Sequence, residues 1–133
     1  MLFYSQTKGE WTADDGAVIV SGCYAGMGAG KNNSAMEDIH NVGPLPCGRY
    51  TISPLHTIPH LGPAMALTPA PMNKMFGRSG FFIHLDNPIH LGASSDGCIV
   101  CASDPEGPLS GYQKQAKIEE LRSAGQDQVT VTP

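Results

Sequence analysis

Short hydrophobic runs, broken by turn-forming residues, follow one another through the first part of the chain. The runs LFYS, EWTA and AVIVSGCY lie within residues 2–24, and they are separated by a Lys-Gly pair and by the stretch from Asp14 to Gly16. Runs rich in aromatic and β-branched residues with such breaks are typical of β-hairpins. The pattern predicts an antiparallel β meander at the edge of a sheet.

Further strands are predicted at three later places. GRYTIS at 48–53 and the alternating VTVT at 129–132 favour strands through their β-branched and aromatic side chains. The run FFI, bounded by a glycine before it and by LDNP after it, indicates a buried central strand that ends at His84. A histidine at a strand end is a common position for a catalytic side chain.

One helix is predicted near the C-terminus. After the apolar IVCA the chain is expected to turn at SDPEGP, residues 103–108. Residues 112–124 then carry helix formers, and Gly125 is suited to cap the helix at its end. Together with the strands, this pattern predicts a mainly β (β-rich α+β) fold.

Two segments lack periodicity and are expected to be functional connections. Residues 25–46 are rich in glycine and asparagine, which predicts a long ordered loop. Between Pro54 and Pro71 there are five prolines, which are expected to prevent any long regular element apart from a short strand, MALT, at 65–68. This segment is expected to form a flap over a cleft.

Composition and charge narrow the class of protein. The 133 residues fit one domain, 1–133, and the 16 glycines and 11 prolines argue against a fold dominated by long helices. With a net charge of -4 and scattered Lys and Arg, the chain lacks the basic patch of a nucleic-acid binder. No stretch is long and apolar enough for a membrane span, and no signal peptide is recognised at the N-terminus. We therefore expect synthesis in the cytoplasm.

The four cysteines allow several chemistries. Cys98 and Cys101 have the CxxC spacing of zinc and redox sites, but Cys23 and Cys47 do not form the second close pair that structural zinc sites use. The pair also lies in an apolar run and not at the start of a helix, where a thioredoxin-like thiol is activated. A zinc- or thiol-stabilised binding module stays open as an alternative, as does Cys101 as a small buried hydrophobe. No metal or cofactor is expected.

Cys98 has the sequence context of a catalytic nucleophile. The stretch SSDGCIV predicts an exposed turn in which Gly97 leaves room for a substrate carbonyl beside the thiol and the backbone amides of Gly97 and Cys98. His84 lies fourteen residues earlier at a strand end, from where it can return beside the thiol and act as its base. Candidates to orient the histidine are Asp86, Asn87, Ser95 or a backbone carbonyl. Asp86 is equally suited to cap a turn.

These residues carry a resemblance to a known family. GRSGFFIH followed by ASSDGCIV resembles the signature of the L,D-transpeptidase (YkuD-type) cysteine enzymes, and it is closer still to the variant in type VI secretion L,D-transpeptidase effectors. NVGPLPCGRYTI at 41–52 and GAGKNNSAM at 28–36 resemble two further motifs of that variant, in the same order. The chain departs from the common pattern with Asp96 in place of a histidine, with Leu85 in place of a glycine, and with the additional His90.

The resemblance implies a β-sandwich or barrel of mostly antiparallel strands with one C-terminal helix. It implies that Cys98 is the nucleophile and His84 the base of an L,D-transpeptidase or L,D-carboxypeptidase, which cleaves peptidoglycan stem peptides between diaminopimelate and D-alanine. It further implies delivery by a type VI apparatus into the periplasm of a target bacterium, and a cognate immunity protein. In that oxidising compartment Cys23 and Cys47 are candidates for a disulfide, or stay free thiols.

Three further residues are expected to contact the substrate. The guanidinium of Arg78 is suited to hold a substrate carboxylate through two hydrogen bonds, although a surface position in a turn is the alternative. Ser95 and Asp96 share the turn that carries Cys98. The alternative enzyme is another cysteine peptidoglycan amidase or endopeptidase, in which the cysteine usually precedes the histidine.

Overall fold

Strands account for most of the regular structure in this computed structural model, which describes residues 1–103 and 109–133. The strands are β1 (Leu2–Ser5), β2 (Glu10–Thr12), β3 (Val18–Val20), β4 (Cys23–Ala25), β5 (Gly48–Ile52), β6 (His56–Ile58), β7 (Gly62–Pro69), β8 (Phe81–Leu85), β9 (Ile99–Cys101) and β10 (Gln128–Thr132). There is one α-helix in the described part, α1 (Gly111–Ser123), and two 3-10 turns, η1 (Gly28–Gly30) and η2 (Ser34–Met36). With 33% strand and 15% helix, the mainly β prediction is confirmed.

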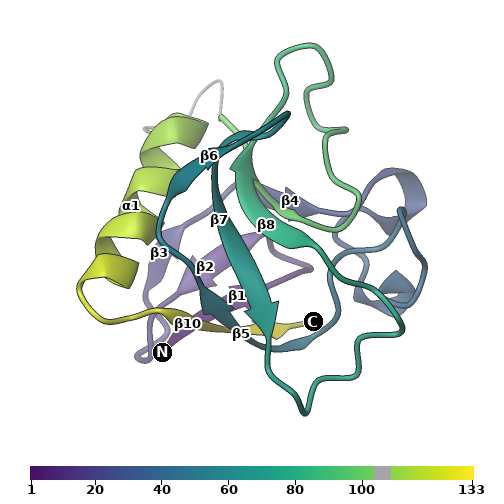
Figure 1. The fold of residues 1–133 in the computed structure, drawn as a ribbon, viewed down its shortest axis with the longest axis horizontal. Coiled ribbons are helices and arrows are strands. Elements are labelled where there is room, and N and C mark those ends of the chain that lie inside the picture. The colour runs from purple at the N-terminus through teal and green to yellow at the C-terminus, as the bar shows by residue number, and fades with distance from the viewer. Residues whose placement is uncertain (104–108) are drawn as a thin grey trace.

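The described strands form one mixed sheet whose two edges come close together (Figure 1). Its order is β3-β2-β1-β10-β5-β7-β8-β9-β4, and β6 pairs with β7 outside this path. The edge strands β3 and β4 are separated in sequence only by Ser21 and Gly22, so the sheet must curl until its edges are neighbours. The amide of Cys23 in β4 donates to the carbonyl of Gly9, between β1 and β2, at 3.0 Å. The architecture is therefore barrel-like.

Most strand pairs are antiparallel, as expected, and two are parallel. β10 runs parallel to β1, and β9 runs parallel to β8. The parallel pair β8–β9 is central to the candidate site, because it brings residues from two distant segments side by side. The apolar run Phe81–Ile83 does lie in a central strand, between β7 and β9, with His84 near its end.

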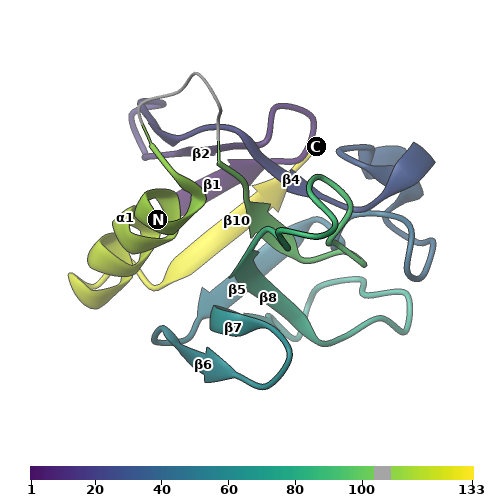
Figure 2. The ribbon, with the colours of Figure 1, turned by 90° about the horizontal axis from the view of Figure 1, so that it is seen from above.

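The core lies inside the curled sheet and is closed on one side by α1 (Figure 2). Its largest fully buried side chains include Trp11, Tyr4 and Tyr50 from the strands and Ile118 from the helix. The long connections at 26–47, 70–80 and 86–98 lie on the side away from α1. The scaffold and the candidate site therefore occupy different parts of the molecule.

The helix forms as the sequence predicts. Ser110 is the N-cap, and its hydroxyl accepts from the amide of Gln113 at 3.2 Å while the Gln113 side chain accepts from the Ser110 amide at 2.8 Å. This reciprocal arrangement satisfies two amides that a helix start leaves unpaired. Gly125 follows the helix with φ +106, a conformation that glycine adopts without strain. The turn predicted at 103–108 lies outside the described residues except for Ser103.

Two expectations for the strands need correction. AVIVSGCY is not one strand, because the chain leaves β3 at Val20 and resumes in β4 at the opposite edge of the sheet. The segment 54–71 is also more regular than expected, since it holds β6 and the eight-residue β7. Pro63 and Pro69 lie at or next to the ends of β7, outside the part that pairs with β8, so neither interrupts that ladder.

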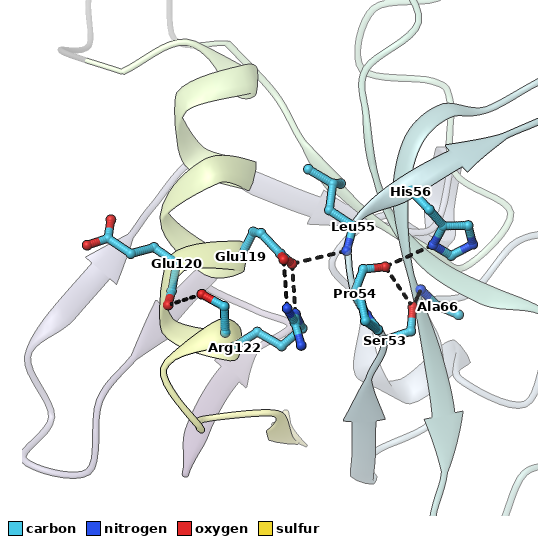
Figure 3. A network of polar contacts seen from close by, with 9 residues as sticks. Ser53, Pro54, Leu55, His56, Ala66, Glu119, Glu120 and Arg122 are labelled. Carbon is cyan, nitrogen blue, oxygen red and sulfur yellow. Dashed lines mark hydrogen bonds and ion pairs between the residues drawn. The ribbon is translucent and has the colours of Figure 1, made fainter.

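Polar contacts attach α1 to the segment before β6 (Figure 3). The carboxylate of Glu119 accepts from the amide of Leu55 at 3.1 Å and from Nε and Nη2 of Arg122 at 2.8 Å. Ser53 accepts from the amide of Ala66 at 2.7 Å, which continues the pairing of β5 with β7 beyond their last ladder bond. In the part of the chain that the structure covers, no helix has the length and apolar character needed to cross a membrane.

Candidate active site

Cys98 lies directly before β9, at the end of the 86–98 connection. Its side chain is half-buried, and its Sγ accepts from the amide of Phe82 in β8 at 3.4 Å. The register of β8 with β9 places Ile83 beside Ile99. One residue earlier on each of these parallel strands, Phe82 lies beside Cys98. Ile99 and Cys101 belong to the core, so Cys98 and Val100 belong to the opposite face of the sheet.

His84 lies on the same face as Cys98, two residues further along in the register. It pairs in register with Val100, which shares its face with Cys98, and its side chain is only 4% exposed. Its Nδ1 lies 2.7 Å from the carbonyl oxygen of Leu85. Because a carbonyl can only accept, Nδ1 carries the proton in this contact, and Nε2 is left able to accept one. Of the candidates to orient the histidine, a backbone carbonyl is the one in contact.

The thiol and the imidazole border two different hollows. The His84 hollow has a volume of about 430 Å³ and is lined by residues that include His60, Leu61, His84 and His90. The Cys98 hollow measures about 360 Å³. In this conformation no hydrogen bond joins the side chains of Cys98 and His84, both of which the structure describes. His60 and Leu61 belong to the β6–β7 turn, so the proline-rich segment borders this hollow, and its role as a flap stays a prediction.

The Cys98 hollow is a polar depression beside the thiol. Its lining residues are His40, Asn41, Gly77, Arg78, Ser79, Gly80, Phe81, Asp96 and Cys98. His40 comes from the long connection after β4 and contacts the carbonyl of Phe76 at 2.8 Å. Sequence reasoning assigned no role to His40, because nothing in its local sequence indicates that it reaches this hollow.

The environment of Cys98 raises the pKa of its thiol. Burial is the main cause, and the carboxylate of Asp96 adds to it. The Phe82 amide, the amide of Cys98 itself and the Arg78 guanidinium act in the opposite direction, because each stabilises negative charge on sulfur. The resting thiol is therefore protonated at neutral pH, and a base is needed to form the thiolate.

Gly97 is required by the shape of the turn. Its φ of +134 is a conformation that other residues rarely adopt, and a Cβ there would lie 2.6 Å from Nη2 of Arg78 and 2.7 Å from Cε1 of Phe81. Its amide donates to Oγ of Ser95 at 3.0 Å, and its carbonyl accepts from Leu45 at 2.9 Å. The expectation that the Gly97 amide is free to hold an oxyanion is therefore wrong for this conformation. The amide of Cys98 stays the candidate.

Ser95 belongs to the scaffold of the turn. It is 0% exposed, and its hydroxyl accepts from the amides of Gly26 and Gly97 and donates to the carbonyl of Cys98. These three bonds use the capacity of the hydroxyl, so the predicted contact of Ser95 with substrate is corrected to a structural role. Asp96 is exposed and borders the Cys98 hollow, where a contact with substrate stays a prediction.

Arg78 is buried, unlike an arginine on a surface turn. It is 7% exposed, and its two terminal nitrogens donate to four backbone carbonyls at 2.7 to 3.0 Å. The four carbonyls belong to Glu37, Gly43, Pro44 and Asp96. Arg78 borders the Cys98 hollow, but its bidentate donors are occupied by the backbone. The prediction that it holds a substrate carboxylate stays untested, and the contacts present are those of a structural clamp.

Asp86 anchors the 86–98 connection, and no hydrogen bond joins its described side chain to that of His84. Its carboxylate accepts from Tyr24 Oη at 2.6 Å, from Ser94 Oγ at 2.8 Å and from the amide of Gly92 at 3.0 Å. These hydrogen bonds, led by that from Tyr24, outweigh burial and lower the pKa of Asp86. Asp86 thus has the turn-capping role that the sequence left open, and its predicted role in orienting His84 is not supported by this geometry.

Tyr24 and Lys31 complete the anchoring of this connection. Lys31 lies over the Tyr24 ring at 4.3 Å and donates to the carbonyl of Gly92 at 3.0 Å. Lys31 belongs to the GAGKNNSAM segment, whose local sequence does not indicate this anchoring role. Its role becomes evident only when β4 is placed beside β9.

The remaining cysteines do not gather around Cys98. Cys101 is in the core and opposite Cys23, whereas Cys98 faces the other side of the sheet. Cys98 and Cys101 therefore cannot ligate one ion together, which argues against the zinc module. Across residues 1–103 and 109–133, no group of three or more His, Cys, Asp or Glu side chains is arranged to hold a metal ion.

The fold and the site define a barrel-like β domain that carries a cysteine and a histidine on one face of two parallel strands. The chain belongs to the Tlde1 domain family, whose model matches residues 20–130. The expected membership of the type VI secretion, L,D-transpeptidase-like effectors is thereby confirmed at the level of the family. No curated protein and no solved structure matches the chain.

Proposed function

We propose that this chain is a cysteine L,D-transpeptidase or L,D-carboxypeptidase that acts on peptidoglycan stem tetrapeptides. The observation that carries the proposal is the placement of Cys98 and His84 on one face of β8 and β9, next to two hollows that can receive peptide. Membership of the Tlde1 domain family supports the same chemistry. The likeness to the wider YkuD-type enzymes rests on the motifs around these two residues.

Activation of the nucleophile begins with proton transfer from Cys98 to Nε2 of His84. The two residues share a face of β8 and β9, two residues apart in register, so the transfer requires the Cys98 side chain to turn toward the imidazole. The carbonyl of Leu85 holds the proton on Nδ1 and so keeps Nε2 in the accepting state. Since burial raises the thiol pKa, the imidazolium that forms beside the sulfur is needed to stabilise the thiolate.

The thiolate then attacks the carbonyl of the L-centre of diaminopimelate in the third position of the stem. The carbon–sulfur bond forms as the carbonyl π bond opens, and the oxyanion is held by the amide of Cys98. Collapse of the intermediate breaks the bond to D-alanine, whose amine takes the proton from His84. The products of this half-reaction are a thioester on Cys98 and free D-alanine.

The second half-reaction transfers the acyl group to an acceptor. His84 takes a proton from water or from an amine, which attacks the thioester, and the sulfur leaves as thiolate. Water gives a carboxypeptidase product, a free D-amino acid gives exchange, and an amine of another stem gives a cross-link. The His84 hollow and the Cys98 hollow each border one of the two reacting residues and are the candidates for the two substrates.

The place of action follows from the substrate. A chain of this family that cleaves stem peptides would work in the periplasm of a target bacterium after delivery by a type VI apparatus. The producing cell would then need an immunity protein that covers one or both hollows.

A muropeptide digest tests the proposal. Purified chain is incubated with disaccharide tetrapeptides, and the products are identified by mass spectrometry. Wild type is expected to release D-alanine, Cys98→Ala to release none, and His84→Ala to react roughly 10² to 10⁴ times more slowly. Cys47→Ala is the matched control, because this second half-buried thiol has its pKa raised to about 12 by burial and by Glu37.

The products also distinguish the competing functions. Cleavage at an amide or endopeptide bond, with D-alanine retained, would replace this proposal by the other class of cysteine peptidoglycan enzyme. A Cys98→Ala variant as active as wild type would refute both enzymes.

A further inference from the structure

Cys23 and Cys101 face one another across the last strand pair of the sheet. β4 runs antiparallel to β9, and the register places Cys23 directly opposite Cys101. Both side chains are buried in the core, with 4% and 1% of their surface exposed. No other pair of cysteines within the described residues has this relationship.

The backbone shows which kind of cross-strand pair this is. The amide of Cys23 donates to Gly9 at 3.0 Å, and Ala25, two residues on, exchanges hydrogen bonds with Asn32. The amide and carbonyl of one strand residue point to the same side, and alternate residues agree in direction. Cys23 and Ala25 therefore direct their backbone away from β9, and Cys23 and Cys101 form a non-hydrogen-bonded pair.

This type of pair has the spacing of a disulfide. Opposite residues in non-hydrogen-bonded positions have Cα atoms about 4.5 Å apart and side chains that approach closely. Disulfides join Cα atoms about 4.4 to 6.8 Å apart, so no strand has to move to form the bond. The thiols already interact, because a hydrogen bond to Cys23, together with burial, raises the pKa of Cys101 well above its ordinary value.

We propose that Cys23 and Cys101 are an oxidative cross-linking site and form a disulfide when the chain folds in an oxidising compartment. The oxidant is a disulfide carried by a small thiol or by a thiol oxidase. The thiolate of Cys23 attacks this disulfide and releases one thiol, and the thiolate of Cys101 then attacks the Cys23 sulfur and releases the second. Two protons and two electrons pass from the cysteines to the oxidant. Cys23 lines a surface hollow beside Lys8, which offers the oxidant an approach.

The pairing replaces the Cys23–Cys47 disulfide that the sequence suggested. Cys47 lies elsewhere, with its Sγ 3.8 Å from Oε1 of Gln6 and its amide bonded to Glu37. The cross-link would also join edge strand β4 to β9, the strand that follows the nucleophile. Since Cys98 faces the other side of β9, it is left without a partner and stays reduced. The cross-link does not depend on the reaction at Cys98.

Peptide mapping of the folded wild-type chain tests the cross-link. The chain is refolded with a mixture of reduced and oxidised glutathione, alkylated, and analysed by mass spectrometry without reduction. We expect a mass lower by two hydrogens, two of the four thiols alkylated, and one linked peptide pair that contains Cys23 and Cys101. A folded chain with four free thiols, or a link through Cys47 or Cys98, would overturn the proposal.

Thermal unfolding is a second test of the cross-link. It compares the oxidised and reduced forms of the wild-type chain, so it does not depend on whether a cysteine variant folds. The oxidised wild type is expected to melt roughly 10 °C higher than the reduced form, since the link closes a long loop. Cys47→Ser should show the same difference, whereas Cys101→Val should show none. An equal difference in Cys101→Val would assign the effect to another thiol and reject the pairing.

Discussion

Arg78 donates from Nη2 to the backbone carbonyl of Asp96 at 3.0 Å, two residues before Cys98. The same nitrogen donates to Gly43, and Nη1 donates to Glu37 and Pro44. One buried guanidinium thus fastens the turn that carries Cys98 to the long connection after β4. It is also a positive charge that lowers the pKa of the Cys98 thiol.

Replacing Arg78 should therefore affect both the turn and the thiol. Arg78→Ala leaves four carbonyls without donors, and we expect a loss of about 1 to 3 kcal/mol of stability. Alkylation of Cys98 by iodoacetamide, followed against pH, should shift to higher pH because a stabilising charge is gone. In Arg78→Lys the pKa of the Cys98 thiol should stay close to the wild-type value, because lysine keeps the positive charge. Only part of the stability should be retained, because lysine lacks the fork of donors.

Arg49→Ala is the matched control for Arg78, because Arg49 is an exposed arginine in β5. It should change neither the melting temperature nor the alkylation profile. If Cys98 in folded Arg78→Ala is alkylated with the wild-type pH profile, the Arg78 guanidinium does not lower the pKa of the thiol.

Gly97→Ala should disrupt the nucleophile turn. A methyl group would meet Nη2 of Arg78 and the Phe81 ring inside ordinary contact distance, and it would strain a φ of +134. Gly16→Ala is the control, because its φ of +84 is also unfavourable but no atom lies within 4 Å of the added Cβ. We expect Gly16→Ala to cost about 1 kcal/mol and Gly97→Ala clearly more, together with loss of activity. Equal melting temperatures of the two variants would contradict this.

Asp96→Asn should make the thiol more reactive. The carboxylate raises the pKa of Cys98, so its removal increases the fraction of thiolate at any pH below that pKa. In a Cys47→Ser background, alkylation of Cys98 at pH 8 is expected to become about two- to three-fold faster. Asp127→Asn, at an exposed position directly before β10, should leave the rate unchanged. A slower rate in Asp96→Asn would show that the carboxylate supports the thiolate instead.

The strands and the nucleophile turn could be predicted because their signals are local. Aromatic and β-branched residues identify β1, β5 and β10, and a glycine before Cys98 identifies the turn. The order of strands could not be predicted, because β10 lies between β1 and β5 through contacts that span almost the whole chain. The prolines of segment 54–71 suggested an irregular flap. The sequence alone does not show that Pro63 and Pro69 lie outside the part of β7 that pairs with β8.

The roles of polar residues near the site depended most on tertiary structure. Asp86 and Ser95 are compatible in sequence with catalysis or with turn capping, and only the position of their partners decides between the two. Ser95 is surrounded by amides from its own turn and from Gly26, and Asp86 by Tyr24 of the distant β4. The burial of Arg78 has the same origin, because its carbonyl partners come from two separate connections.

Glu119 should make the attachment of α1 dependent on pH. The hydrogen bond from Arg122, with a smaller one from the Leu55 amide, lowers the pKa of Glu119 (Figure 3). A carboxyl with a lowered folded pKa contributes stability that is complete above its unfolded pKa and is lost as the pH falls through the folded value. Because the pair is near the surface, we expect Glu119→Gln to cost about 0.5 kcal/mol at pH 7 and clearly less at roughly pH 3, as the carboxyl becomes protonated. Glu120→Gln, the exposed neighbour, is the control and should melt like wild type at both pH values. Urea unfolding at the two pH values measures the difference, and a cost for Glu119→Gln that does not change with pH would mean that the ionised carboxylate is not what holds the helix to Leu55.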